Sequence, residues 1–145
     1  GFIYYTPKKY NENSIDKDRH ITTGYIDRKI YDKNPMTVKE LKHKIGNNST
    51  IILENNLKGL FRYVASIYSK ILLEYDSNQH LNFVIFGCDI AIGSNLDCKL
   101  MEINKGPDLS FKDERDGNVK KTLISNVLHE INVINEPHEN FINIY

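Results

Sequence analysis

Two neighbouring strand-like segments carry the side chains in this chain that could bind a cation. Asp89 lies in the first segment, and Glu102 and Asn104 lie in the second. Because side chains alternate between the two faces of a strand, Glu102 and Asn104 share one face. If the turn between the segments centres on Asn95 and Leu96, an antiparallel pairing places Asp89 directly opposite Glu102.

Two carboxylates placed in this way need a reason to be close together. Opposed side chains in a sheet lie roughly 4.5–5.5 Å apart at Cβ, and like charges at that distance destabilise the pair. A divalent cation removes the repulsion, and Mg²⁺ prefers oxygen ligands such as carboxylates. The amide oxygen of Asn104 would complete an all-oxygen set. The alternative is a hairpin whose polar face simply meets water, but the apolar sequence around Asp89 favours a central strand, where a buried carboxylate needs a partner.

A longer pattern surrounds these side chains. Residues 86–90 read Phe-Gly-Cys-Asp-Ile, and residues 100–107 read Leu-Met-Glu-Ile-Asn-Lys-Gly-Pro. The order of these motifs, with a long helix before them, resembles the C-terminal core of the tubulin–tyrosine ligase family of ATP-grasp ligases. Residues 19–23 (Arg-His-Ile-Thr-Thr) are similar to the family's His-Leu-Thr-Asn segment, and residues 1–5 are similar to the strand before it. The resemblance covers residues 1–134.

The resemblance implies a reaction and a metal site. The reaction would be an ATP- and Mg²⁺-dependent ligation that joins an amino acid to a protein carboxylate through an acyl phosphate. Two Mg²⁺ ions would be bound, with Asp89 ligating one, Glu102 bridging both and Asn104 ligating the second. The acceptor would be tubulin or another protein tail, and no separate catalytic side chain is expected in this chain.

The resemblance also implies contacts with nucleotide or substrate from His20, Thr22 and Lys105. Each residue except Thr22 has a structural alternative in the sequence. His20 could fill space at the edge of the sheet, and Lys105 could be a solvated loop lysine, which is the usual state of lysine. Lys8 and Lys9 could meet phosphate from the preceding loop or remain solvated.

The chain departs from the family pattern at two positions. Tyr5 stands where the family usually has Arg, and Thr23 stands where it usually has Asn. Lys8 or Lys9 would replace the Arg only in part, because lysine lacks the planar fork of arginine. The family's Gly-rich phosphate loop and ATP-binding lysines have no counterpart in these residues. The alternative function is therefore a non-catalytic protein- or nucleotide-binding module. A ligase acting on a small molecule is a third possibility, which the long helix disfavours.

Composition limits the classes of partner and the compartment. The 145 residues correspond to one domain, and the formal net charge is +0. Without a basic excess, nucleic acid is not the expected partner. No apolar run is long enough to span a bilayer and no signal peptide is visible, so no membrane partner is expected. Cys88 and Cys98 are expected on opposite faces of the hairpin, which disfavours a disulfide and suits a reducing, cytoplasmic compartment.

Periodicity predicts amphipathic helices packed on an antiparallel sheet, and the resemblance implies that this α+β fold is the C-terminal half of an ATP-grasp domain. The domain would span residues 1–134 and be followed by a polar tail at 135–145. The expected strands are 2–6, 81–92 and 97–104, with residues 20–23 as a short strand or an extended segment, and the expected helices are 38–45, 49–75 and 114–132. An apolar stripe on the long helix comprises Leu57, Leu60, Phe61, Val64, Ile67, Tyr68, Ile71 and Tyr75, and the last helix directs Val119, Leu123, Ile124, Val127, Leu128 and Ile131 inward.

Overall fold

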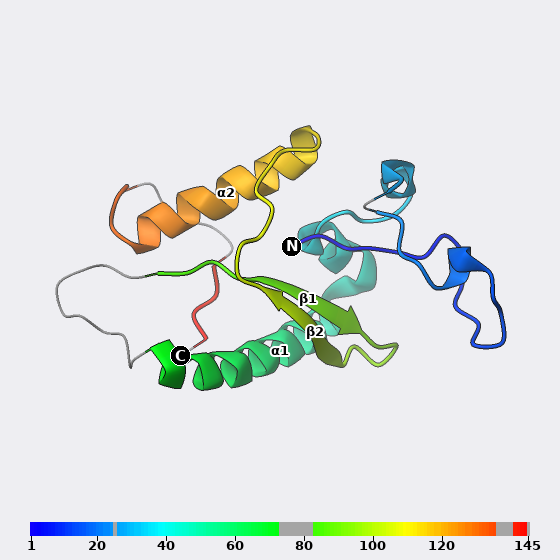
Figure 1. Cartoon of the computed structure of the whole chain (residues 1–145), viewed down its shortest axis with the longest axis horizontal. Coiled ribbons are helices and arrows are strands. Elements are labelled where there is room, and N and C mark those ends of the chain that lie inside the picture. The colour runs from blue at the N-terminus through cyan, green and yellow to red at the C-terminus, as the bar shows by residue number, and fades with distance from the viewer. Residues whose placement is uncertain (25, 73–82, 136–140, 145) are drawn as a thin grey trace. The chain divides into compact units, whose positions relative to one another are not determined.

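The computed structural model describes residues 1–24, 26–72, 83–135 and 141–144, and it has the expected α+β class (Figure 1). Its elements are the 3₁₀ helices η1 (Lys17–Arg19) and η2 (Arg28–Asp32), helices α1 (Val38–Leu72) and α2 (Glu114–Glu130), and strands β1 (Gly87–Ile92) and β2 (Cys98–Asn104). The chain divides into two compact units, Gly1–Ile51 and Ile52–Tyr145, which are described one at a time.

The first unit is held together by backbone contacts between its beginning and the start of α1. Phe2 and Thr37 form a single antiparallel bridge, and the Ile3 amide donates to the Met36 carbonyl at 2.8 Å. The expectation of a regular strand over residues 2–6 is therefore wrong. The physical reason lies in the partner segment, because residues 4–6 would have to pair with residues 35–33. Pro35 has no amide to donate, and residue 33 caps the end of helix η2, so the pairing cannot continue.

Residues 20–23 also form no strand among the described residues. His20 ends the short helix η1, whose first residue follows the capping carboxylate of Asp16. Only the Thr23 amide pairs across the chain, donating to the Tyr5 carbonyl at 2.8 Å. A local side-chain cap has outcompeted strand formation here, as capping Asp residues do in short turns.

Helix α1 begins and breaks where the sequence predicts. The Glu40 amide donates to the Thr37 hydroxyl at 3.2 Å, which caps the helix. The Glu40 carboxylate accepts from the amide of Met36, the residue before the cap, at 2.8 Å. The break is at Gly46, whose φ of 79° and ψ of 169° are not helical. Helix α1 therefore consists of two helical segments, one before Gly46 and one after it. The expected continuation of the second segment over residues 73–75 lies outside the described residues.

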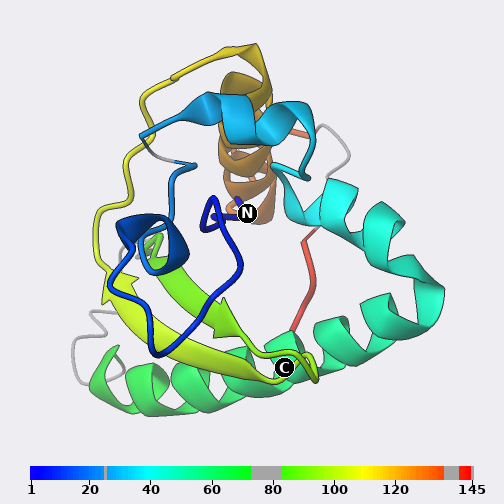
Figure 2. The same ribbon diagram turned by 90° about the vertical axis from the view of Figure 1, so that its right-hand side faces the viewer.

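The second unit contains the hairpin, with the helical segment after the break running beside it (Figures 1 and 2). Asn56 donates its side-chain amide to the Leu96 carbonyl in the hairpin turn at 2.8 Å. Further along α1, the Tyr68 and Phe86 rings lie 5.0 Å apart between centroids. The expected apolar stripe is half-buried at Leu57, Leu60, Phe61, Val64 and Tyr68 but exposed at Ile67 and Ile71, and Leu53, one turn earlier, is the most buried residue of the helix at 1% exposure.

The hairpin is shorter than the sequence predicts at its first strand. Strand β1 begins at Gly87, so the apolar residues 83–86 precede the strand instead of forming it, and residues 81–82 lie outside the described part of the chain. Strand β2 agrees with the prediction to within one residue, and α2 starts at the predicted Glu114. The described residues contain one two-stranded sheet, so β1 is not a central strand.

The buried residues of helix α2 differ from those that the sequence predicts. Its six predicted inward residues are only half-buried, whereas the buried positions are Asp116, Gly117, Lys120 and Asn126. Asp113 caps the helix by accepting a hydrogen bond from the Asp116 amide at 2.7 Å. After α2, the Ile144 carbonyl accepts a 2.7 Å hydrogen bond from Arg62, which connects the described part of the tail to α1.

The break in α1 gives a test of the fold. We expect Gly46→Ala to lower the free energy of unfolding by about 1–2 kcal/mol, because Ala rarely adopts this positive φ. The matched control is Gly59→Ala, which lies inside the helix and, like Gly46, has no atom within 4 Å of an added Cβ. We expect the control to raise the free energy of unfolding by roughly 0.5–1 kcal/mol.

Urea unfolding followed by circular dichroism measures both changes. If Gly46→Ala stabilised the protein as Gly59→Ala does, helix α1 would be continuous through residue 46 in solution, and the break would be refuted.

Candidate functional site

The carboxylate face, defined here by Asp89, Glu102 and Asn104, forms one side of the hairpin. Asp89 pairs directly with Glu102, and Gly87 pairs with Asn104 two residues further along. The predicted register is therefore confirmed at the residues that matter for cation binding. All three side chains are exposed, so the expectation of a buried Asp89 is wrong. Its strand has a partner on one side only, and the described residues leave its polar face open.

A bulge at Met101 produces this register. Near the turn Ile90 pairs with Leu100, but after the bulge Asp89 pairs with Glu102, which leaves Met101 as the extra residue of β2. A bulge inserts one unpaired residue and shifts every side chain beyond it to the opposite face. Met101 is 70% exposed beside Glu102.

The bulge also corrects the expected placement of the two cysteines. Cys98 pairs with Ile92, and alternation then places Cys98 on the same face as Cys88, opposite the carboxylate face. Both thiols are free, as expected. Partial burial and then the neighbouring Asp89 raise the pKa of Cys88 above its ordinary value, and burial and then Asp97 do the same for Cys98. Both thiols therefore stay protonated near neutral pH and are poor nucleophiles.

The donor set of the carboxylate face fits a hard cation. Within the described residues, neither the Asp89 nor the Glu102 carboxylate forms a side-chain hydrogen bond or ion pair. Two opposed carboxylates without a cationic partner are unfavourable unless a cation joins them. Three oxygen-bearing side chains match the preference of Mg²⁺. In the same part of the chain, no three His, Cys, Asp or Glu side chains cluster as a metal site, so Asn104 must supply any third protein ligand.

Gly87 is a site residue that sequence reasoning missed. A Cβ added at Gly87 would lie 3.1 Å from the Pro107 Cβ and 3.7 Å from the Asn104 Cβ. Pro107 therefore lies against the end of β1 in the space that a side chain would occupy. A glycine inside a strand often marks such a close approach, and this signal was present in the sequence.

Lys105 follows directly after Asn104 and is exposed. Its ammonium has no ion-pair partner among the residues that the structure describes. It is consequently available to an anionic ligand at this end of the hairpin. The structure leaves open both readings of Lys105, a ligand contact and a solvated lysine.

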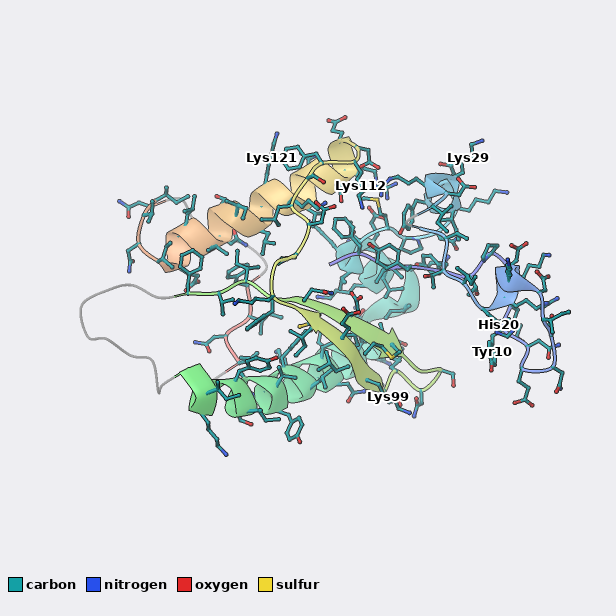
Figure 3. The ribbon with its side chains drawn as sticks, viewed as in Figure 1. Tyr10, His20, Lys29, Lys99, Lys112 and Lys121 are labelled. Atoms are coloured by element: carbon teal, nitrogen blue, oxygen red, sulfur yellow. The ribbon has the colours of Figure 1, made fainter. Side chains whose placement is uncertain are left out.

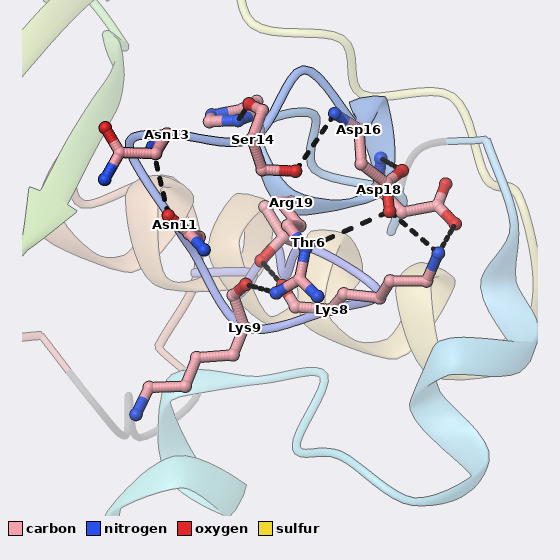
Figure 4. A network of polar contacts seen from close by, with 10 residues as sticks. Thr6, Lys8, Lys9, Asn11, Asn13, Ser14, Asp16, Asp18 and Arg19 are labelled. Atoms are coloured by element: carbon pink, nitrogen blue, oxygen red, sulfur yellow. Dashed lines mark hydrogen bonds and ion pairs between the residues drawn. The ribbon is translucent and has the colours of Figure 1, made fainter.

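His20 and Lys8 belong to a polar network in the first unit (Figure 4). Lys8 Nζ lies 2.9 Å from Asp16 Oδ2 and 3.2 Å from Asp18 Oδ2. Arg19 donates to the Lys9 carbonyl at 2.6 Å. Lys8 is thus engaged within its own loop by two ion pairs.

The His20 ring has two contacts in this loop. Its Nε2 lies 2.5 Å from the Ser14 carbonyl, and its ring meets Tyr10 edge-on at 5.3 Å between centroids (Figure 3). These contacts support the structural alternative for His20. Thr22 is exposed, and its side chain forms no hydrogen bond with another of the described residues. The first unit holds these residues and the second holds the carboxylate face.

Tyr5, at the position of the expected arginine, has a packing role. Its hydroxyl donates to the Pro35 carbonyl at 2.9 Å, and its pKa is raised by partial burial and then by Glu40. Tyr31 likewise donates to the Ile3 carbonyl at 2.6 Å. The two tyrosines connect the first residues of the chain to the segment before α1.

With the hairpin and its face described, comparison with known proteins identifies the class. The family profile described as "Tubulin-tyrosine ligase family" matches residues 1–140. The chain therefore belongs to this family.

The particular relatives are modest in similarity. The chain is 24% identical over 143 residues to the protein named "Probable tubulin polyglutamylase TTLL9" from Rattus norvegicus and, equally, to that from Bos taurus. Each alignment covers 92% of this chain and 30% of the relative, so the chain spans less than a third of their length. No solved structure matches the chain. Among the described residues, no helix is long and apolar enough to cross a membrane.

The ion pairs of the first loop give a pH test. The hydrogen bond from Lys8, followed by the Asp18 amide, holds the pKa of Asp16 below its ordinary value of 3.8. A lowered pKa means that the contact contributes fully above pH 3.8 and is lost as the pH falls through the lowered value. NMR titration of the Asp16 carboxyl carbon should therefore have its midpoint below pH 3.8.

Lys8→Met should move this midpoint up toward the ordinary value. The matched control is Lys9→Met, because Lys9 contributes only its backbone carbonyl to the network. An unchanged midpoint in Lys8→Met would refute the ion pair.

Proposed function

We propose that this chain supplies the metal-binding strands of an ATP- and Mg²⁺-dependent ligase that joins an amino acid to a protein carboxylate through an acyl phosphate. The observation that carries the proposal is the direct pairing of Asp89 with Glu102, with Asn104 on the same exposed face. Membership in the tubulin–tyrosine ligase family supplies the reaction class.

In this proposal each side chain of the face has a part in ligand binding. Asp89 would ligate one ion, Glu102 would bridge two ions, and Asn104 would ligate the second through its amide oxygen. When bound, the ions would neutralise the negative charge of phosphate oxygens, which is the usual role of Mg²⁺ in phosphoryl transfer. The chain's own contribution is positioning, since the hairpin ladder fixes the separation of the carboxylates.

The anionic ligand would meet the chain at the end of β2. Lys105 follows the last ligand and is exposed, so it would contact the phosphates or an acidic substrate. Thr22 would contact nucleotide or substrate, and His20 would support the loop that carries it. The relatives' names point to tubulin as the acceptor, so we propose a carboxylate of tubulin or of another protein tail. The proposed compartment is the cytoplasm.

A second candidate function is a non-catalytic binding module. Two observations favour it: Tyr5 is engaged with the Pro35 carbonyl, and Lys8 is engaged with Asp16 and Asp18. Neither residue is then available as the cation that the family usually places here. Such a module would bind a protein tail or a nucleotide without turnover.

The proposal is tested by removing the carboxylates while keeping their shape. In the full polypeptide that carries this chain, Asp89→Asn and Glu102→Gln should each weaken Mg²⁺-dependent ATP binding roughly a hundredfold or more, because even residues behind a metal ligand cost about tenfold to a hundredfold. Calorimetry with and without Mg²⁺ measures the affinity.

The matched control is Asp97→Asn, a carboxylate of the same hairpin that lies in the turn and not on the carboxylate face. It should leave the affinity unchanged. Unchanged affinity in Glu102→Gln would contradict the metal site, and Mg²⁺-dependent binding without ATP turnover would favour the non-catalytic module.

A further inference from the structure

The loop after the carboxylate face is held by two side chains of α2. Residues 105–113 connect β2 to α2. Lys120 Nζ donates to the Ser110 carbonyl at 2.5 Å. Asp116 Oδ2 accepts a hydrogen bond from the Lys112 amide at 2.8 Å, and the same oxygen lies 3.0 Å from Lys120 Nζ. One ion pair thus fixes the loop backbone at two points.

This ion pair is buried to a degree that is unusual for charged residues. The Lys120 and Asp116 side chains are 9% and 4% exposed. A buried ion pair is weak evidence for stability, because well-packed apolar side chains often replace it without loss. The pair does fix the position of the loop, because the Lys120 ammonium and the Asp116 carboxylate each form a hydrogen bond with a backbone atom of that loop.

The opposite end of the loop lies against the carboxylate face itself. Gly87 pairs with Asn104 in the last rung of the hairpin, and Pro107 occupies the space beside Gly87. Near α2, the Phe111 ring lies 3.4 Å from where a Cβ at Gly117 would be. The loop is therefore anchored at both ends, with Asn104 immediately before the first anchor.

From this arrangement we infer that Asp116 and Lys120 are positioning residues for the carboxylate face. By fixing residues 105–113, they hold Asn104 and Lys105 in one arrangement beside the two carboxylates, ready for a divalent cation and its anionic ligand. The inference rests on the proposed function, and it extends the site to a helix whose side chains touch neither metal nor substrate.

Three variants of the full polypeptide that carries this chain separate positioning from stability. Lys120→Met keeps the length of the side chain but leaves the Asp116 carboxylate buried without its ammonium. The double variant Asp116→Leu/Lys120→Met removes both charges and keeps an apolar interior, so it should fold with a melting temperature close to wild type. The matched control is Lys70→Met, an exposed lysine in the last turn of α1.

Two measurements are made on each variant. Mn²⁺ affinity is measured from the electron paramagnetic resonance signal of the free ion, and amide hydrogen exchange is measured over residues 105–113. We expect the double variant to bind Mn²⁺ about tenfold more weakly, as is typical when the support of a metal ligand is removed. Its loop amides should exchange faster, and Lys70→Met should match wild type in both.

The outcomes are distinguishable. Wild-type affinity or wild-type loop exchange in the folded double variant would overturn the inference, because the pair would then serve stability alone. Absence of Mn²⁺ binding in the wild-type protein would instead refute the proposed metal site, and the inference would fall with it. If Lys120→Met fails to fold, the double variant still tests whether the pair positions the carboxylate face.

Discussion

The direct pairing of Asp89 with Glu102 is the constraint on which the site depends. Two carboxylates opposed on one face repel each other, and within the described residues no lysine or arginine joins them. The hairpin holds them there through its backbone ladder, and it can do so because the face is open to solvent. A divalent cation held by the two carboxylates and the Asn104 amide oxygen would offset this repulsion, which is the physical basis of the proposed metal site.

The surrounding structure serves this pairing at three places. Helix α1 contacts the hairpin at both ends, through Asn56 at the turn and Tyr68 beside the start of β1. Pro107 covers Gly87 at the last rung, and the buried pair of Asp116 and Lys120 fixes the loop beyond it. A site built on an exposed two-stranded hairpin has little rigidity of its own, so these contacts supply the fixed geometry that ligand binding needs.

Much of the chemistry was predictable from the sequence because it depends on order and alternation. The order of the motifs indicated the family, and the alternation of side chains along a strand placed Glu102 and Asn104 on one face. The capping residues Thr37 and Glu40 marked the helix start, and Gly46 marked the break. The prediction of a regular strand over residues 2–6 failed, and residues 20–23 form no strand among the described residues, because strand formation needs a partner of sufficient length, which local sequence does not reveal.

The sequence by itself determined the family, the α+β class and the three oxygen-bearing side chains of the carboxylate face. Tertiary structure decided the rest. The bulge at Met101 set which face Cys98 occupies, because a one-residue insertion in pairing reverses alternation beyond it. The exposure of Asp89 depended on the number of strands paired with β1, and the burial of Lys120 depended on an acidic partner one helical turn away and on a carbonyl ten residues earlier. Apart from the local pairing of Lys120 with Asp116, each is a relation between backbone segments that are separated in sequence, which local residue patterns do not specify.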